Sequence, residues 1–201
     1  MTQSDTNTRR ALVLYAHPCP ESFNAAVHDT VVGTLKAGGW TVDDCDLNAE
    51  GFSPVLSEAE RRGYHEAPEN LAPVAPYVAR LRAADALVLV FPVWNFGYPA
   101  ILKGFFDRVC LPGVSFELRE GKVRPALTNI KQLMACTTYG GTRFRAFLNG
   151  DPPRKNVTRA LRYACGMPPC HYLPLYDMNR NSAQVRTAHL AHVQQKVERL
   201  A

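Results

Sequence analysis

The segment "ALVLVFP", residues 86–92, restricts the fold more than any other part of the chain, because all seven of its residues are apolar. A short, continuously apolar run is typical of a strand that is buried on both faces of a parallel sheet. The segment "ALVLYA", residues 11–16, has the same character. The first run is therefore expected to form a central strand and the second a strand of the same sheet.

Segments with helical periodicity alternate with these strands. Phe23, Val27, Val31 and Leu35 recur every four residues and predict one apolar helix face, which the glycines at 38–39 end. Further helices are predicted from a Ser57–Glu60 capping box, around Val74, Val78 and Leu81, from Pro99 at a first helical position to Val109, over residues 154–165, and from Ser182. Further strands are predicted at residues 40–47, 130–138 and 171–176, with a hairpin insertion at 116–123.

This alternation predicts an α/β fold, with helices on both faces of a parallel sheet. Five strands fit the flavodoxin-like, doubly wound order 2-1-3-4-5 in three layers. The polar strand at 40–47 and the strand containing Pro174 are expected at the two edges, since proline cannot donate to a central ladder. We expect a single flavodoxin-like domain over residues 11–201, after a flexible polar N-terminus at residues 1–10.

Composition narrows the possible partners and surroundings. The net charge of +5 is scattered along the chain, which indicates a solvated surface and no nucleic-acid partner. No apolar run is long enough for a signal peptide or a membrane insertion. The six cysteines show no CxxC pair, so we expect a reducing cytoplasm. His189 and His192 lack a third ligand, so no metal is expected and both are predicted to lie on the surface.

Three segments of unusual composition follow strands of the predicted sheet. They are "HPCPESFN" at residues 17–24, "PVWNFGYP" at residues 92–99 and "TTYGGT" at residues 137–142. In doubly wound folds ligands bind beyond the carboxyl ends of the strands, at the point where the strand order reverses. The three loops are therefore expected to meet at one edge of the sheet.

The first loop has the features of an anion site without glycine. If Ser22 caps the following helix, the amides of the first turn point at an anion, and His17 and Asn24 add side-chain donors. The alternative is a plain capped helix with a buried histidine. Neither GxxxxGK[ST] nor GxGxxG is present, which excludes the common ATPase and dinucleotide motifs.

The other two loops favour a planar ligand. Trp94 and Phe96 can stack on a ring whose polar edge the neighbouring backbone reads, although a dimer contact would explain the same aromatics. Gly140 and Gly141 let the backbone approach a ligand, beside the hydroxyls of the preceding threonine pair. The combination predicts a ligand with a flat heteroaromatic ring that carries a phosphate or pyrophosphate. A flavin has both parts.

At these residues the chain resembles the flavodoxin-like NAD(P)H:quinone oxidoreductase family. The family's first motif, a histidine followed by S-F-N, matches residues 17–24. Its second motif, F-P with an aromatic turn and then G-x-P-A-x-L-K-G-x-x-D-R-V, matches residues 91–109. Its third motif, T-T-x-G-G, matches residues 137–141. The resemblance covers residues 12–142 well and the last third more loosely. Downstream of the glycines, "TRFRAFLNGDPP" supplies neither the tyrosine nor the histidine of the mammalian-type enzymes.

The resemblance implies a homodimer with non-covalent FAD, or FMN as the alternative, and NAD(P)H as co-substrate. It also implies a two-step relay, in which the nicotinamide reduces the flavin and leaves before a quinone-like acceptor takes the hydride. The backbone and side chains expected to hold the cofactor are those of His17, Ser22, Phe23, Asn24, Pro92, Val93, Trp94, Asn95, Phe96, Thr137, Thr138, Tyr139, Gly140 and Gly141. Of these, Tyr139, Gly140 and Gly141 are expected to take part in catalysis, with loop amides stabilising negative charge on the reduced ring.

Three alternative functions share the fold. One is an FMN-dependent azoreductase or nitroreductase, because the Asn95–Phe96 pair resembles the flavin loop of the related azoreductases. Another is a redox-sensing regulatory subunit with a potassium-efflux transporter as its partner. The third, a flavodoxin-type electron carrier, is disfavoured by the basic composition. Arg143 and Arg145, just beyond the glycines, are candidates to meet the phosphates of the nicotinamide cofactor, or else are solvated arginines.

Overall fold

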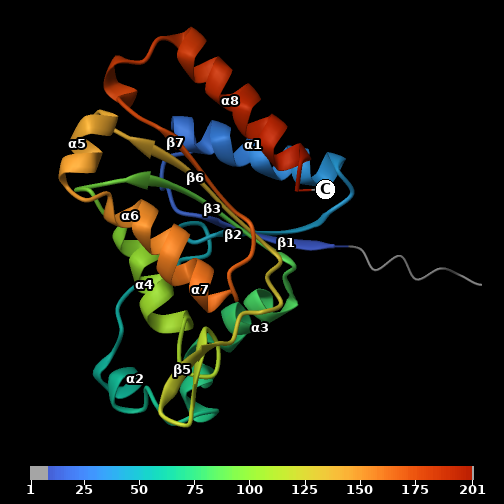
Figure 1. The fold of residues 1–201 in the computed structure, drawn as a ribbon, viewed down its shortest axis with the longest axis vertical. Coiled ribbons are helices and arrows are strands. Elements are labelled where there is room, and N and C mark those ends of the chain that lie inside the picture. Colours follow the sequence, from blue (N-terminus) through green and yellow to red (C-terminus); the bar gives the residue numbers. More distant parts are fainter. Residues whose placement is uncertain (1–8, 201) are drawn as a thin grey trace, which may run out of the picture.

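The computed structural model describes residues 9–200 and alternates strands with helices along the chain (Figure 1). The main elements are β1 (Arg10–Tyr15), α1 (Phe23–Ala37), β2 (Thr41–Asp46), α2 (Glu58–Arg62), η1 (Glu69–Val74), α3 (Ala75–Ala83), β3 (Ala86–Val93), α4 (Ala100–Val109), β4 (Phe116–Arg119), β5 (Lys122–Pro125), β6 (Gln132–Tyr139), α5 (Arg143–Leu148), α6 (Pro152–Lys155), η2 (Asn156–Leu161), α7 (Arg162–Ala164), β7 (Cys170–Leu175), η3 (Met178–Arg180) and α8 (Ala183–Glu198). Residues 1–8 of the predicted flexible N-terminus lie outside the described part, and Arg10 already belongs to β1.

The five-stranded parallel sheet confirms the predicted fold class. Its strand order is β2-β1-β3-β6-β7, which is 2-1-3-4-5 when the hairpin is left out of the count. The hairpin, β4 with β5, is antiparallel and forms a separate two-stranded sheet, as the sequence predicts. Among residues 9–200, no helix is long and apolar enough to cross a membrane.

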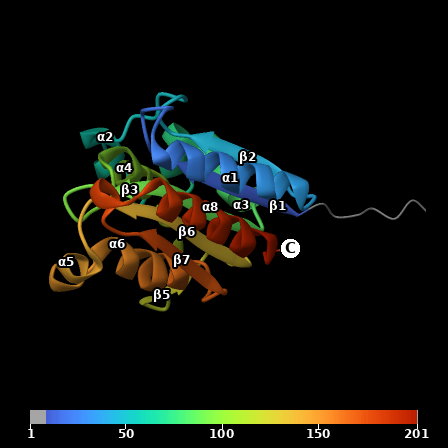
Figure 2. The same ribbon diagram turned by 90° about the horizontal axis from the view of Figure 1, so that it is seen from above.

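Two layers of helices cover the two faces of the sheet, and the strands send alternate side chains to each. Leu12 and Leu14 of β1 pack with α3 and α4, whereas Val13 and Tyr15 pack with α1 and α8. Figures 1 and 2 show α1 and α8 together on one face, and α3, α4 and the α6–α7 segment on the other. Every residue of β3 is buried, which explains why its sequence is apolar without a break.

Both predicted edge strands lie at the edges. In β2, Asp43 pairs with Arg80, whose guanidinium lies 2.7 Å from an oxygen of Asp43 and 2.8 Å from an oxygen of Glu50, which follows the strand. Pro174 lies in β7, at the other edge, opposite Thr137 of β6. Charge on one edge and proline on the other limit pairing with further strands.

Three details of the helices differ from the predictions. The helix predicted over residues 154–165 begins at Pro152 and contains a π-helical turn, η2, in its middle. Pro99 is the N-cap of α4 and does not occupy its first helical position. The prediction of a surface position for His189 is wrong, because this side chain on α8 is only 9% exposed and packs against Phe23 of α1.

Gly104 permits close contact between α4 and the segment before α2. A methyl group at this position would overlap the Cα and carbonyl oxygen of Pro54, which are backbone atoms and cannot rotate away. We therefore expect Gly104→Ala to lower the free energy of unfolding by about 1–3 kcal/mol, as overpacking does. Urea unfolding measures this change.

Gly33 of α1 is the matched control, since a methyl group there meets no atom within 4 Å. Gly33→Ala gains helix propensity without a clash and should raise the free energy of unfolding by about 0.5–1 kcal/mol. Equal effects of the two substitutions would contradict the close approach at Gly104.

Candidate functional site

The pairing between β1 and β3 ends before β3 does, and this leaves a gap at the carboxyl edge of the sheet. The last paired residues are Tyr15 and Val90, and the amide of Ala16 donates to the carbonyl of Val90 at 3.1 Å. Pro92 lies two residues further and faces the same side, where β1 has already ended. Its missing N–H therefore leaves no ladder bond unmade. The loops after β1 and β3 diverge here, at the reversal of strand order.

The loop after β1 ends in a capped helix, as predicted. Ser22 is the N-cap of α1, and its hydroxyl accepts a hydrogen bond from the amide of Ala25 at 3.1 Å. The amides of Phe23 and Asn24 lie in the first turn, where a helix has no acceptors of its own. The loop is closed by His17, whose Nδ1 accepts from the amide of Cys19 at 3.0 Å.

The loop after β3 is a tight turn with strained backbone. The amides of Trp94 and Gly97 each donate to the other's carbonyl, at 3.2 and 2.8 Å. Between them, Asn95 and Phe96 have φ angles of 47° and 57°, the left-handed pair of a type I′ turn. A residue with a side chain in this region costs of order 1–3 kcal/mol and is found most often at functional sites.

Two contacts join the loops to one another. The ring of His17 packs edge-on against Trp94, with 5.6 Å between centroids. The amide nitrogen of Asn24 donates to the hydroxyl of Thr138 at 2.6 Å, in a buried hydrogen bond that spans 114 residues of sequence. The structure thus brings the three predicted loops together at one edge. Thr137 and Thr138 lie at the end of β6, and Pro92 and Val93 lie at the end of β3.

Two buried oxygens at this edge lack protein partners. Within residues 9–200, neither Oδ1 of Asn24 nor Oγ1 of Thr137 has a hydrogen-bond partner. Buried polar atoms are nearly always satisfied in folded proteins, so such atoms are expected to meet a ligand or water. The amide side chain of Asn24 thus has one end bound to Thr138 and one end free.

The two glycines after β6 leave open space. A Cβ atom built on Gly140 would have the Nδ2 of Asn179 as its nearest neighbour, at 3.6 Å, and one on Gly141 would lie 3.8 Å from the Cβ of Arg145. These are ordinary contact distances. Nothing in the protein itself requires glycine here, which is consistent with a ligand that occupies the space above the backbone.

Tyr139 contributes to the edge through its backbone, because its side chain is turned into the core. The ring is 2% exposed, and its hydroxyl donates to Asp151 at 2.6 Å and lies 2.5 Å from that of Tyr172. Burial raises the pKa of Tyr139 well above its usual range. The hydroxyl is therefore held neutral and engaged away from the loops.

Several supporting residues were not predicted from the sequence. Tyr176 packs on Tyr139, with 4.6 Å between centroids, and the amide of Asp177 donates to the carbonyl of Gly141 at 2.9 Å. The segment after β7 thus braces the glycine loop. No local pattern marks these residues, because the contacts join segments more than thirty residues apart.

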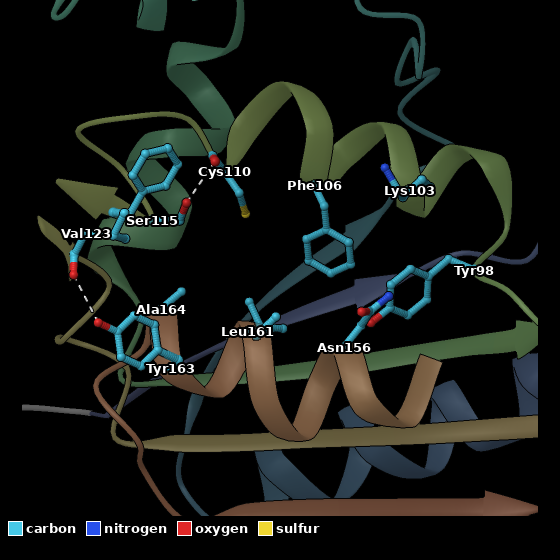
Figure 3. Close-up of a pocket in the computed structure, with 12 residues that line it drawn as sticks. Tyr98, Lys103, Phe106, Cys110, Ser115, Val123, Asn156, Leu161, Tyr163 and Ala164 are labelled. Atoms are coloured by element: carbon cyan, nitrogen blue, oxygen red, sulfur yellow. Dashed lines mark hydrogen bonds between the residues drawn. The ribbon is translucent and has the colours of Figure 1, made fainter. Parts of the chain in front are cut away.

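A separate apolar cavity of about 370 Å³ lies between α4, the hairpin and the α6–α7 segment. Figure 3 shows Phe106 from α4 facing Leu161, with Tyr98 at one end. At the other end the hydroxyl of Tyr163 donates to the carbonyl of Val123 at 3.0 Å. None of the predicted flavin-site residues lines this cavity. Among residues 9–200, no group of three or more metal-ligating side chains is close enough to hold a metal ion.

The residues at the edge suit a flavin. The helix end, Ser22 and His17 offer donors for phosphate, the turn at 94–97 offers an aromatic wall, and the unpartnered oxygen of Asn24 can accept a hydrogen bond. The open backbone at the glycines provides room for a planar ring. This donor and acceptor set fits a ring with a polar edge and an anionic tail.

Comparison with known proteins places the chain in a family. The family described as having a flavodoxin-like fold matches residues 9–200, so the chain belongs to this family and the resemblance inferred from the three motifs is confirmed. The chain is 29% identical over 213 residues to NAD(P)H dehydrogenase (quinone) 1 of Cavia porcellus, covering 96% of this chain and 77% of that protein.

The same enzyme from Rattus norvegicus is 35% identical over 148 residues, 66% of this chain and 54% of that protein. The chain thus spans about half the length of the rat relative. An NAD(P)H:quinone oxidoreductase from Methanothermobacter marburgensis has the same fold, with a TM-score of 0.83 at 23% identity, covering 96% of this chain and all (100%) of that one. An FMN-dependent NADH-azoreductase from Bacillus anthracis, in complex with FMN, has a TM-score of 0.79 at 16% identity, with 96% and 100% coverage.

The burial of His189 beside Phe23 predicts a pH dependence of stability. Burial, with a smaller contribution from His192, lowers the pKa of His189 to about 4, whereas an unfolded chain takes up this proton near pH 6.5. The contribution of neutral His189 to the free energy of unfolding is therefore fully present above about pH 6.5 and is lost as the pH falls toward 4. We expect His189→Leu to reduce the loss between pH 7 and pH 4.5 by about 2 kcal/mol, measured by denaturant unfolding at both values. Equal pH dependence in the two proteins would contradict a neutral, buried His189.

Proposed function

We propose that this protein is a flavin-dependent NAD(P)H oxidoreductase that passes a hydride to a quinone or similar acceptor. The observation that carries the proposal is the meeting of the three loops through Asn24–Thr138 and His17–Trp94. Relatives named as quinone dehydrogenases support it. When bound, the flavin would accept the hydride from NAD(P)H and give it to the acceptor after the nicotinamide has left.

The protein's own residues would bind and orient the cofactor. The first-turn amides of α1, with Ser22 and His17, would hold the phosphate end. Trp94 and Phe96 would flank the ring, and the backbone of Tyr139, Gly140 and Gly141 would lie against it. The amides of residues 94–96 and 138–141 would act as fixed dipoles that stabilise negative charge without reorganisation. At the first of these loops Asn95 and Phe96 would contribute, since the amide of Trp94 already donates to the carbonyl of Gly97.

We infer FAD as the cofactor and FMN as its alternative. The histidine-to-SFN loop at residues 17–24 supports FAD, because it follows the quinone oxidoreductase pattern. The structurally similar azoreductase that binds FMN supports the alternative, with an azo or nitro compound as acceptor. All six cysteines are free thiols in the structure, which supports a reducing compartment, the cytoplasm.

A homodimer is part of the same proposal. Large apolar side chains are exposed around the hairpin and the adjoining helix, at Leu118, Val123, Tyr163 and Met167. Clusters of this kind usually mark a contact surface. Regulation of a potassium-efflux transporter stays the alternative function, and we find no contact among residues 9–200 that favours it over catalysis.

The decisive experiment identifies the chromophore and its reduction. Purified protein should show flavin absorbance, and heat release followed by chromatography should yield FAD. NADPH or NADH should bleach the bound flavin under anaerobic conditions, and a quinone should restore the colour. Protein that takes up neither FAD nor FMN, or bound flavin that neither nucleotide bleaches, would overturn the proposal.

Substitution of Gly140 tests the position of the ring. The space around Gly140 accepts a Cβ atom and its backbone is not left-handed, so Gly140→Val should change the stability of the apoprotein by less than about 1 kcal/mol. The added methyl groups would occupy the place of the ring, so the Kd for flavin should rise at least about tenfold, with a smaller rise for Gly140→Ala. Flavin titration by fluorescence quenching measures both, and unchanged affinity in the valine variant would exclude a ring at this loop.

A further inference from the structure

A pocket rich in positive charge lies beside the glycine loop, outside the proposed flavin site. It has a volume of about 310 Å³ and lies between α5, the α6–η2 helix and Tyr176. Its cationic lining consists of Arg143, Arg154, Lys155 and Arg159. The pocket also contains the carboxylate of Asp151, which accepts a hydrogen bond from the hydroxyl of Tyr139. Four cations therefore face a single carboxylate.

In the part of the chain that the structure describes, these four cations lack the carboxylate partners that hold Arg80 and Arg108 in place. Arg80 and Arg108 each have a carboxylate oxygen within 2.8 Å, from Glu50 and Glu60 respectively. Within residues 9–200, no carboxylate oxygen lies within 4.0 Å of any charged nitrogen of the four. A group of unpaired cations around one concavity favours an anionic ligand.

The π-helical turn η2 contributes to this grouping. A π-helix has more residues per turn than an α-helix, which brings side chains five apart onto one side. Arg154, in α6 just before the π turn, and Arg159, within the turn, are five apart, and both line the pocket together with Thr158. Arg154 also stacks on Tyr172, 5.4 Å from the ring centroid, which fixes its direction. Such π turns occur most often at functional sites.

An exposed aromatic side chain completes the pocket. Phe147 of α5 lines it and is 74% exposed. An exposed phenyl ring beside unpaired arginines offers a stacking surface for a planar base next to donors for a phosphate. The lining therefore has the two parts that recognise a nucleotide bearing a phosphate.

The pocket adjoins the loop proposed to hold the flavin ring. Tyr176 lines the pocket on one side and packs against Tyr139 on the other. Arg143 comes directly after Thr142, the N-cap of α5, and two residues after Gly141. The pocket therefore borders the loop against which the reactive ring of a dinucleotide would lie.

We propose that this pocket binds the adenosine 2′-phosphate end of NADPH and so makes the protein select NADPH over NADH. The inference rests on the proposed function, since it assigns the hydride donor of the same site. A 2′-phosphate carries nearly two negative charges at neutral pH, whereas NADH has an uncharged hydroxyl there. Arginine and lysine side chains therefore discriminate between the two nucleotides at this point.

The test uses the whole protein with Lys155→Gln and Arg159→Gln combined. Both side chains are exposed, and neither makes an ion pair or belongs to the proposed flavin site. Arg199→Gln, at the C-terminal end of α8 and far from α5 (Figure 1), removes one charge as the control. Lys155→Arg with Arg159→Lys keeps the charge and should retain binding. Calorimetry with adenosine 2′,5′-bisphosphate and with 5′-AMP reports on the pocket without any need for flavin reduction.

We expect the double glutamine variant to bind the bisphosphate about tenfold more weakly and to show a similar rise in KM for NADPH. KM for NADH should not change, and the Arg199 control should behave as the wild type. Equal losses for NADPH and NADH would overturn the proposal, since the cations would then meet the shared diphosphate. Absence of bisphosphate binding to the wild type would also overturn it.

The outcomes separate this proposal from the proposed function. If NADH and NADPH reduce the flavin equally well and the protein does not bind the bisphosphate, the proposed oxidoreductase activity stands. The assignment of the pocket as a 2′-phosphate site is then wrong. The opposite outcome is a protein that binds the bisphosphate, loses this binding in the double variant and holds no reducible flavin. It would support the phosphate site and overturn the proposed oxidoreductase activity.

Discussion

The burial of β3 on both faces is the constraint on which the rest of the structure depends. Each of its eight residues is buried, so helices must cover the sheet from both sides. Parallel strands joined by helical crossovers all end at the same edge, and the order of connections reverses between β1 and β3. The position of the candidate site is therefore fixed by the topology before any side chain in the loops is chosen.

The loops at that edge are ordered by a few specific contacts. The buried hydrogen bond from Asn24 to Thr138 joins the start of α1 to the end of β6, and the His17–Trp94 contact joins the loops after β1 and β3. The left-handed Asn95–Phe96 turn is strained by of order 1–3 kcal/mol at each residue. A strained turn persists only when its surroundings hold it, and here it keeps Trp94 in an exposed position where the ring can meet a ligand.

The sequence allows the fold to be predicted because the relevant signals are local. Seven apolar residues in "ALVLVFP" indicate the central strand, and the polar strand at residues 40–47 and Pro174 indicate the two edge strands, which fit the observed order. Cap chemistry at Ser22 and at the Ser57–Glu60 box is equally local. The three segments of the site are predictable for the same reason, since each contains or follows the carboxyl end of a strand.

The remaining features depend on contacts between distant segments. His189 resembles a surface residue within its own helix, and only the packing of α8 on α1 buries it against Phe23. Tyr139 resembles a loop residue beside two glycines, yet β6 extends through it and its hydroxyl is held by Asp151 and Tyr172. Side-chain periodicity assigns a face, but the partner on that face comes from another part of the chain.

The charge distribution shows the same separation between local pattern and assembled structure. Along the sequence the cations at positions 143, 154, 155 and 159 are unremarkable within a scattered net charge of +5. In the folded chain the left-handed Asp151 is the N-cap of α6, and the helical segment that follows it carries Arg154, Lys155 and Arg159 to one pocket with Arg143 of α5. The resulting basic pocket borders the glycine loop through a single pair of packed tyrosines, Tyr139 and Tyr176. One edge of the sheet thus combines an aromatic and amide surface suited to a planar ring with a cationic surface suited to a phosphate, the two chemistries that NADPH, unlike NADH, carries at its opposite ends.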